Sequence, residues 1–153
     1  MKKFKFTLQT IHNVREMRQE KEEQILSEIQ SKINFAKLRL SDLEKLRFEA
    51  IENYTQKLKS GNAINPFEME LNTNHFASLD RSIREAKAEI EVIKYEYSEQ
   101  SRVLATANQQ VKITERLHEN QKSRYRTELD RTEQTAIDEL VSANYARQML
   151  ITK

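Results

Sequence analysis

The sequence contains few of the residues that interrupt regular structure. Its 153 residues include one glycine, Gly61, one proline, Pro66, no cysteine and no tryptophan. Globular domains average about 7% glycine and about 5% proline, because the turns between their elements use both residues. A chain whose two breakers lie together in the stretch SGNAINPFE (60–68) is therefore expected to turn once.

Other absences limit the compartment and the kind of protein. Without cysteine there are no disulfides and no thiolate metal sites, and the reducing cytoplasm is the simplest compartment. The longest apolar runs are three residues, as at 149–151, so no segment is expected to span a bilayer. The opening MKKFKF has the lysines of a signal peptide but lacks its apolar stretch. We expect a soluble protein that is not inserted in a membrane.

The sequence also argues against an enzyme or a metalloprotein. A single glycine is too few for a Walker A loop or a Rossmann fingerprint, which need glycine where the backbone approaches phosphate. His12, His75 and His118 lie apart, and none has a second histidine three or four residues on. A chain that turns only once offers no cleft in which a pair of carboxylates could be desolvated and their pKa values separated. We therefore expect no catalytic residue, no cofactor and no metal.

Charged residues are abundant and balanced. They make up 33% of the chain, and 26 basic residues offset 24 acidic ones to leave a net charge of +2. Interspersed charges of both signs are typical of a solvated helix face rather than of a disordered tail. The segment KSRYR (122–126) combines basic and aromatic residues, as a nucleic-acid contact would, but acidic residues flank it. A solvated or partner-facing surface is the simpler interpretation, and nucleic acid is not an expected partner.

The apolar residues of the second half follow a heptad repeat. Alternating steps of three and four residues place two rows on one stripe of a helix, as in a coiled coil. The rows are Phe76, Ile83, Ile90, Tyr97, Leu104 and Val111, and Leu79, Ala86, Ile93, Gln100 and Ala107. Beyond them the stripe turns polar, at Thr114, His118 and Gln121. An apolar row then resumes in a shifted register, at Leu129, Ala136, Leu140, Ala143 and Leu150.

The first half carries a similar stripe, which predicts another long helix. Its positions are Ile29, Ile33, Ala36, Leu40, Leu43, Ala50 and Tyr54. Upstream, a shorter stripe is formed by Phe4, Leu8, Ile11 and Val14. Residues 18–24, RQEKEEQ, include no apolar side chain, but Arg, Gln, Glu and Lys are good helix formers, so the helix is expected to continue through them.

The two breakers fit the end of one helix and the start of the next. Gly61 can adopt the left-handed conformation that ends a helix without a Cβ clash. Asn65 and Pro66 suit a helix cap and a first helical residue, with Glu68 three residues after the cap. The run Asn-Thr-Asn at 72–74 could cap a helix again, which would make 66–71 a separate short turn.

The sequence therefore predicts an all-α fold, a long antiparallel two-helix coiled-coil hairpin in a single domain over residues 1–153. The first helix covers about 8–60, the connection 61–73 and the second helix about 74–150. At 1.5 Å per residue the helices are roughly 80 and roughly 115 Å long, so the last ~25 residues of the second extend past the first. Apolar surface left uncovered on a helix usually marks a binding site.

Both ends of the chain resemble the FliJ family, the soluble component of the flagellar type III export apparatus. The resemblance lies in FKFTLQTIHNVREMRQEKEE (4–23) and in ERLHENQKSRYRTELDRTEQTAIDELVSANYAR (115–147). Within the second segment it rests above all on Glu133-Gln134 followed by Asp138-Glu139-Leu140. Length, two-helix layout and turn position are similar as well.

The resemblance implies a stalk-like part in flagellar protein export. Family members look like the central stalk of rotary ATPases, associate with the hexameric export ATPase, and contact the transmembrane export gate and export chaperones. Together with the overhang, this implies ATPase-binding residues at Leu8, Arg15, Leu129, Glu133, Gln134, Ile137, Asp138, Glu139 and Leu140. Tyr54 and Leu79, toward the hairpin tip, are the candidates for gate binding, although both also fit the seam between the helices. The protein is then expected in the cytoplasm, held at the inner membrane by the export apparatus.

Three alternatives stay open. The equivalent stalk protein of a virulence type III secretion system would have the same physical features, although the EQ…DEL segment favours the flagellar version. A structural coiled-coil tether would not stimulate an ATPase. A coiled-coil arm that binds nucleic acid would lose affinity steeply with added salt.

Overall fold

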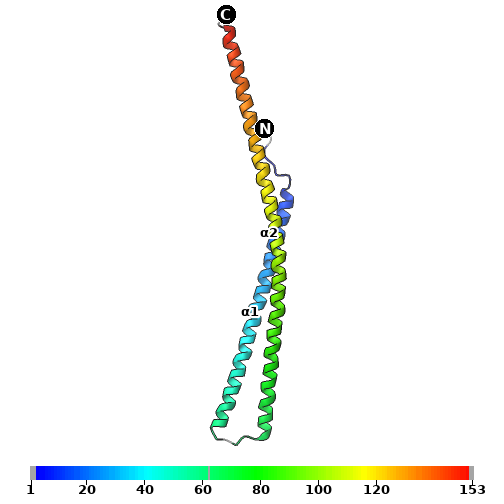
Figure 1. The fold of residues 1–153 in the computed structure, drawn as a ribbon, viewed down its shortest axis with the longest axis vertical. Coiled ribbons are helices and arrows are strands. Elements are labelled where there is room, and N and C mark those ends of the chain that lie inside the picture. The colour runs from blue at the N-terminus through cyan, green and yellow to red at the C-terminus, as the bar shows by residue number, and fades with distance from the viewer. Residues whose placement is uncertain (1–2, 62, 152–153) are drawn as a thin grey trace. The chain divides into compact units, whose positions relative to one another are not determined.

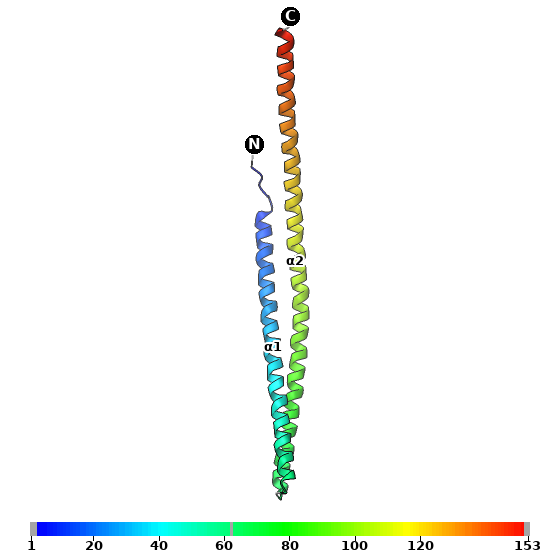
Figure 2. The same cartoon turned by 90° about the vertical axis from the view of Figure 1, so that its left-hand side faces the viewer.

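The computed structural model describes residues 3–61 and 63–151. They form two helices, α1 (Gln9–Lys59) and α2 (Pro66–Ile151), and this part of the chain contains no strand. The helices pack against each other as a hairpin around a single turn (Figures 1 and 2). The predicted all-α hairpin is confirmed.

The turn is shorter than the sequence indicated. α1 ends at Lys59, and Gly61 has a φ of 72°, the left-handed conformation expected of it. Asn65 caps α2: its side-chain oxygen accepts a hydrogen bond from the Phe67 amide at 3.1 Å, and its carbonyl accepts one from the Met69 amide at 3.1 Å. Residue 62, within the expected connection, lies outside the described residues.

α2 begins at Pro66 rather than near residue 74, so 66–71 is not a separate turn. The side chains expected to cap a later start bond to carbonyls of the preceding helical turn instead. Asn72 donates to the Glu68 carbonyl at 2.9 Å, and Thr73 donates to the Met69 carbonyl at 2.8 Å. Such i−4 bonds leave the helical ladder intact, so the helix continues through both residues.

Residues 20–105 form one compact unit whose core is the predicted seam. Its buried side chains are Ile33 and Ala36 from α1, and Leu79, Ile83, Ala86 and Ile90 from α2. Ion pairs cross between the helices beside this core, from Arg39 to Glu89 at 3.5 Å and from Arg47 to Asp80. The heptad prediction is confirmed for these positions.

The other unit contains residues 3–19 and 106–151, and its core is smaller. Ala107, Val111 and Thr114 are buried on α2, together with Phe6 from the segment before α1. That segment packs through aromatic rings: the centroid of Phe6 lies 4.9 Å from that of His118. Phe4 lies 5.6 Å from His118 and 5.5 Å from Tyr125. A non-helical strap of residues 3–8 therefore continues the packing past the first residue of α1.

The stripe predicted at the N-terminus is wrong in part. Ile11 and Val14 are exposed, whereas α1 turns His12, Arg15 and Gln19 toward α2. Each of these finds a hydrogen-bond partner there: His12 bonds Thr114, Arg15 the Gln110 carbonyl and Gln19 the Asn108 side chain, at 2.7, 2.9 and 2.6 Å. Polar residues of α1 thus face this part of α2 and bond to its polar groups, which lie beside the buried Ala107 and Val111.

No helix in residues 3–61 and 63–151 is long and apolar enough to cross a membrane. The organisation of residues 1–153 as a single domain stays a prediction.

Candidate functional site

The most prominent exposed surface lies on the C-terminal part of α2. Before it, Gln121 bonds to Thr7 and Tyr125 packs against Phe4, both from the N-terminal part of the same unit. Leu129 is partly buried, and every residue from 130 to 151 is exposed. Figures 1 and 2 both draw this segment, orange to red, running on past the blue first turns of α1. We refer to residues 130–151 as the free segment.

The free segment keeps large apolar side chains in water. Leu140 is 65% exposed, Ile137 54% and Ile151 84%; the others are Val141, Tyr145, Met149 and Leu150. An isolated helix of this kind gains no tertiary packing, so its helicity depends on local pairs and on continuity with the packed part of α2. One such pair is present: Gln134 donates to the Asp138 carboxylate at 2.9 Å. The predicted overhang and its uncovered apolar positions are confirmed.

The structure gathers most of the predicted ATPase-binding residues on this surface. Glu133, Gln134, Ile137, Asp138, Glu139 and Leu140 are all exposed within the free segment, and Leu129 lies directly before it. Their arrangement offers an apolar stripe with carboxylates beside it. That combination suits a protein partner, because the apolar area supplies affinity and the charges fix orientation.

Leu8 and Arg15 lie elsewhere in the same unit. The Leu8 carbonyl accepts the His12 amide at 2.9 Å, at the start of α1. Arg15 donates to the Gln110 carbonyl at 2.9 Å. Gln110 and Glu133 are about 35 Å apart along the axis of α2. The structure therefore does not join Arg15 with Glu133 in one patch, and a partner that touches both must extend along the helix.

Tyr54 and Leu79, the candidates for gate binding, contribute to the core near the turn. Leu79 is 8% exposed. Tyr54 is partly buried, and its ring meets that of Phe76 edge to face, with centroids 5.8 Å apart. Both residues thus complete the seam between the helices, and a partner at this end would meet Tyr54 at the surface and Leu79 only if the helices separated locally.

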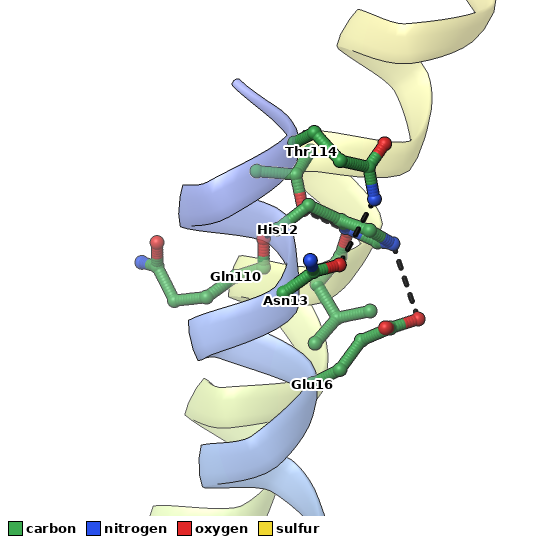
Figure 3. Close-up of polar contacts among 7 residues, drawn as sticks. His12, Asn13, Glu16, Gln110 and Thr114 are labelled. Atoms are coloured by element: carbon green, nitrogen blue, oxygen red, sulfur yellow. Dashed lines mark hydrogen bonds and ion pairs between the residues drawn. The ribbon is translucent and has the colours of Figure 1, made fainter. Parts of the chain in front are cut away.

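A polar cluster fixes the first turns of α1 on α2 (Figure 3). Thr114 is 1% exposed, and its hydroxyl donates to the Val111 carbonyl at 2.8 Å. Its oxygen also forms a hydrogen bond with His12 Nδ1 at 2.7 Å, and His12 Nε2 lies 3.1 Å from Glu16 Oε1. Figure 3 shows the His12 ring between these two partners. This cluster holds the segment in place, so its role is structural.

The sequence analysis did not find this cluster, because it considered His12 only as a metal ligand. A signal was present: buried threonine and histidine at stripe positions of two antiparallel helices need each other as partners. Among the described residues no group of three or more His, Cys, Asp or Glu could hold a metal ion.

Comparison with known proteins gives one result. The family model described as the flagellar FliJ protein matches residues 4–150. Searches of curated proteins and of solved structures found no match.

Proposed function

The chain belongs to the flagellar FliJ family, a non-enzymatic component of the flagellar export apparatus, and from this premise we propose that it is a stalk-like coiled coil that binds the export ATPase. In this proposal the free segment enters the hexameric ring, promotes its assembly and raises its activity. The single observation that carries the proposal is the exposure of Ile137, Leu140 and their apolar neighbours.

The physical reason is the difference in free energy between water and an interface. Burying apolar surface stabilises by about 25 cal/mol per Å², and the free segment leaves its large apolar side chains without any cover. Ring subunits that close around it would remove that surface from water, so hexamer formation would be favoured when the segment is bound. The proposed contacts are Leu129, Glu133, Gln134, Ile137, Asp138, Glu139 and Leu140. Leu8, directly before α1, and Arg15, in its first turns, are proposed as further contacts.

We further propose contacts at the turn with the transmembrane export gate, centred on Tyr54 with Leu79 behind it, and contacts with export chaperones. Together these would hold the protein at the cytoplasmic face of the inner membrane. Exposed apolar residues near the turn, Leu58, Phe67, Met69 and Leu71, support a partner there.

The test is reconstitution with the cognate flagellar export ATPase. The two proteins are mixed, the hexamer fraction is measured by size-exclusion chromatography with light scattering, and ATP hydrolysis is followed in parallel. We expect co-elution, more hexamer and faster hydrolysis. Co-elution without any change in hexamer or hydrolysis would favour a tether, and absence of co-elution would reject ATPase binding.

A further inference from the structure

The free segment and Leu129 before it carry a residue pattern that is symmetric about Leu140. Seven positions before Leu140 is Glu133, and seven positions after it is Arg147. Eleven positions before it is Leu129, and eleven after it is Ile151. Seven and eleven residues are two and about three helical turns, so these residues share one face of the helix with Leu140. At these two distances the matching positions are complementary in chemistry: an apolar residue mirrors an apolar one, and an acid mirrors a base. At three and four positions from Leu140, Ile137 mirrors Ala143 and Ala136 mirrors Asn144.

Such a pattern fits a second copy of the same helix lying antiparallel. When two copies cross at Leu140, each residue before it faces the residue equally far after it in the other copy. Leu140 then meets Leu140, Leu129 meets Ile151, and Glu133 meets Arg147 twice. A parallel pair would instead place Glu133 beside Glu133 and Arg147 beside Arg147, where like charges repel.

Most of the side chains that would form this pairing are exposed to solvent. Leu140 and Ile151 are largely exposed, as are Glu133 and Arg147. In residues 3–61 and 63–151 neither Glu133 nor Arg147 makes an ion pair, in contrast to Asp138, which accepts from Gln134. Two charges of opposite sign thus lie on one face of the helix without an ion-pair partner among residues 3–61 and 63–151, two turns to either side of an exposed leucine.

We propose that the chain self-associates through residues 129–151 as an antiparallel pair centred on Leu140, with two Glu133–Arg147 ion pairs across the interface. In this pairing Ala136 faces Asn144 and Ile137 faces Ala143 of the other copy, so the positions next to Leu140 bury little apolar surface. The pair is therefore weak and reversible. It covers the free segment when no other partner does, and it does not rest on the proposed function.

Charge reversal tests the pairing on the full-length chain. Sedimentation velocity is measured over a range of concentrations for the unmodified chain, Glu133→Arg, Arg147→Glu and the double variant. Each single change places like charges opposite each other and is expected to weaken self-association at least about tenfold. The double variant restores opposite charges and is expected to associate within about threefold of the unmodified chain. Arg131→Glu is the matched control: it reverses a charge on the far side of the same helix and should change nothing.

Mixing the two single variants makes the test independent of folding defects. The Glu133→Arg chain would place two arginines opposite two glutamates of the Arg147→Glu chain, so the mixture should associate at concentrations at which each variant alone stays monomeric. Circular dichroism should show the same helix content for all variants, because the changed residues are exposed. An unmodified chain that stays monomeric at several hundred micromolar overturns the proposal, as does a mixture that fails to associate. No ATPase is present, so either failure leaves the proposed function untouched.

Discussion

At the scale of single residues, the molecule separates side chains that hold the two helices together from side chains that are left in water. His12, Arg15 and Gln19 have hydrogen-bond partners on α2 at 2.6–2.9 Å, although a hydropathy pattern gives them no role. Leu140 is apolar and in phase with a heptad row, and it has no cover. Whether these side chains are buried depends less on their polarity than on whether another part of the chain packs against them.

Two exposed residues provide the sharpest test of binding. Leu140→Ala together with Asp138→Ala should leave the helical signal and melting temperature nearly intact, because both side chains are exposed and the change removes only the exposed bond between Gln134 and Asp138. Truncations at the centre of an interface can cost 2 kcal/mol or more, and about 1.4 kcal/mol is tenfold in affinity. We therefore expect ATPase binding, measured by titration calorimetry, to weaken at least tenfold.

The matched control is Glu91→Ala together with Val92→Ala. It also removes an acid and an exposed apolar side chain from α2, within residues 20–105. It should bind the ATPase as the unmodified chain does. If the Leu140 and Asp138 variant stays folded and binds equally well, these residues do not contact the ATPase. If it unfolds, they belong to an intramolecular core.

The His12 cluster gives a second prediction at this scale. His12→Ala removes the hydrogen bond between the ring and the Thr114 hydroxyl, which keeps the Val111 carbonyl as a partner. A lost hydrogen bond of this kind costs about 1 kcal/mol. Hydrogen exchange of the amides at 12–19 should become faster by about fivefold, which is what about 1 kcal/mol gives. Gln30→Ala, which removes a bond within α1 to Asn34, should leave those amides unchanged; equal effects would mean that His12 does not anchor α1.

At the scale of the elements, the sequence contained most of what was needed. The heptads of 76–111 predicted the seam because an apolar stripe on each helix can be buried only against the other. Gly61 and Pro66 located the turn because Gly61 takes a left-handed φ of 72° after α1 and Pro66 is the first residue of α2. The start of α2 was misplaced, since Asn72 and Thr73 bond equally well as caps or to carbonyls within a helix, and the choice depends on the residues before them.

The packing of the N-terminal strap, residues 3–8, could not be predicted from the heptad pattern either. Phe4 and Phe6 pack as rings against His118 and Tyr125 from a non-helical segment, so helical spacing does not describe them. The free segment, in contrast, followed from length alone, because a second helix longer than the first must leave residues uncovered.

The seam itself can be tested by burying charge. Ile83 and Ile90 are buried, so Ile83→Asp or Ile90→Asp leaves an unpaired carboxylate in the core of residues 20–105. Each should lower the free energy of unfolding by about 3 kcal/mol or more. Ser98→Asp, at an exposed position of the same helix, should change the melting temperature little. Similar losses for all three in thermal unfolding would show that the seam lies elsewhere.

At the scale of the whole molecule, the chain combines two helices that pack against each other with a helical end, residues 130–151, that is exposed. Membership of the flagellar FliJ family places this arrangement in the export apparatus. The uncovered end is where an ATPase partner is proposed, and a second copy of the chain is proposed to cover the same surface when that partner is absent. Both proposals depend on one property, the accessibility of the free segment to another protein.

That property can be measured directly, because the chain has no cysteine and a single one can be introduced without background. A fluorophore attached at Val141→Cys reports on the free segment, and one at Ser98→Cys reports on an exposed position in residues 20–105. Iodide quenching is measured at low concentration of the chain, before and after the hexameric export ATPase is added. We predict that quenching at position 141 falls severalfold on binding while quenching at position 98 stays the same. If the two proteins co-elute and position 141 remains as accessible as before, the free segment is not the surface that binds the ATPase.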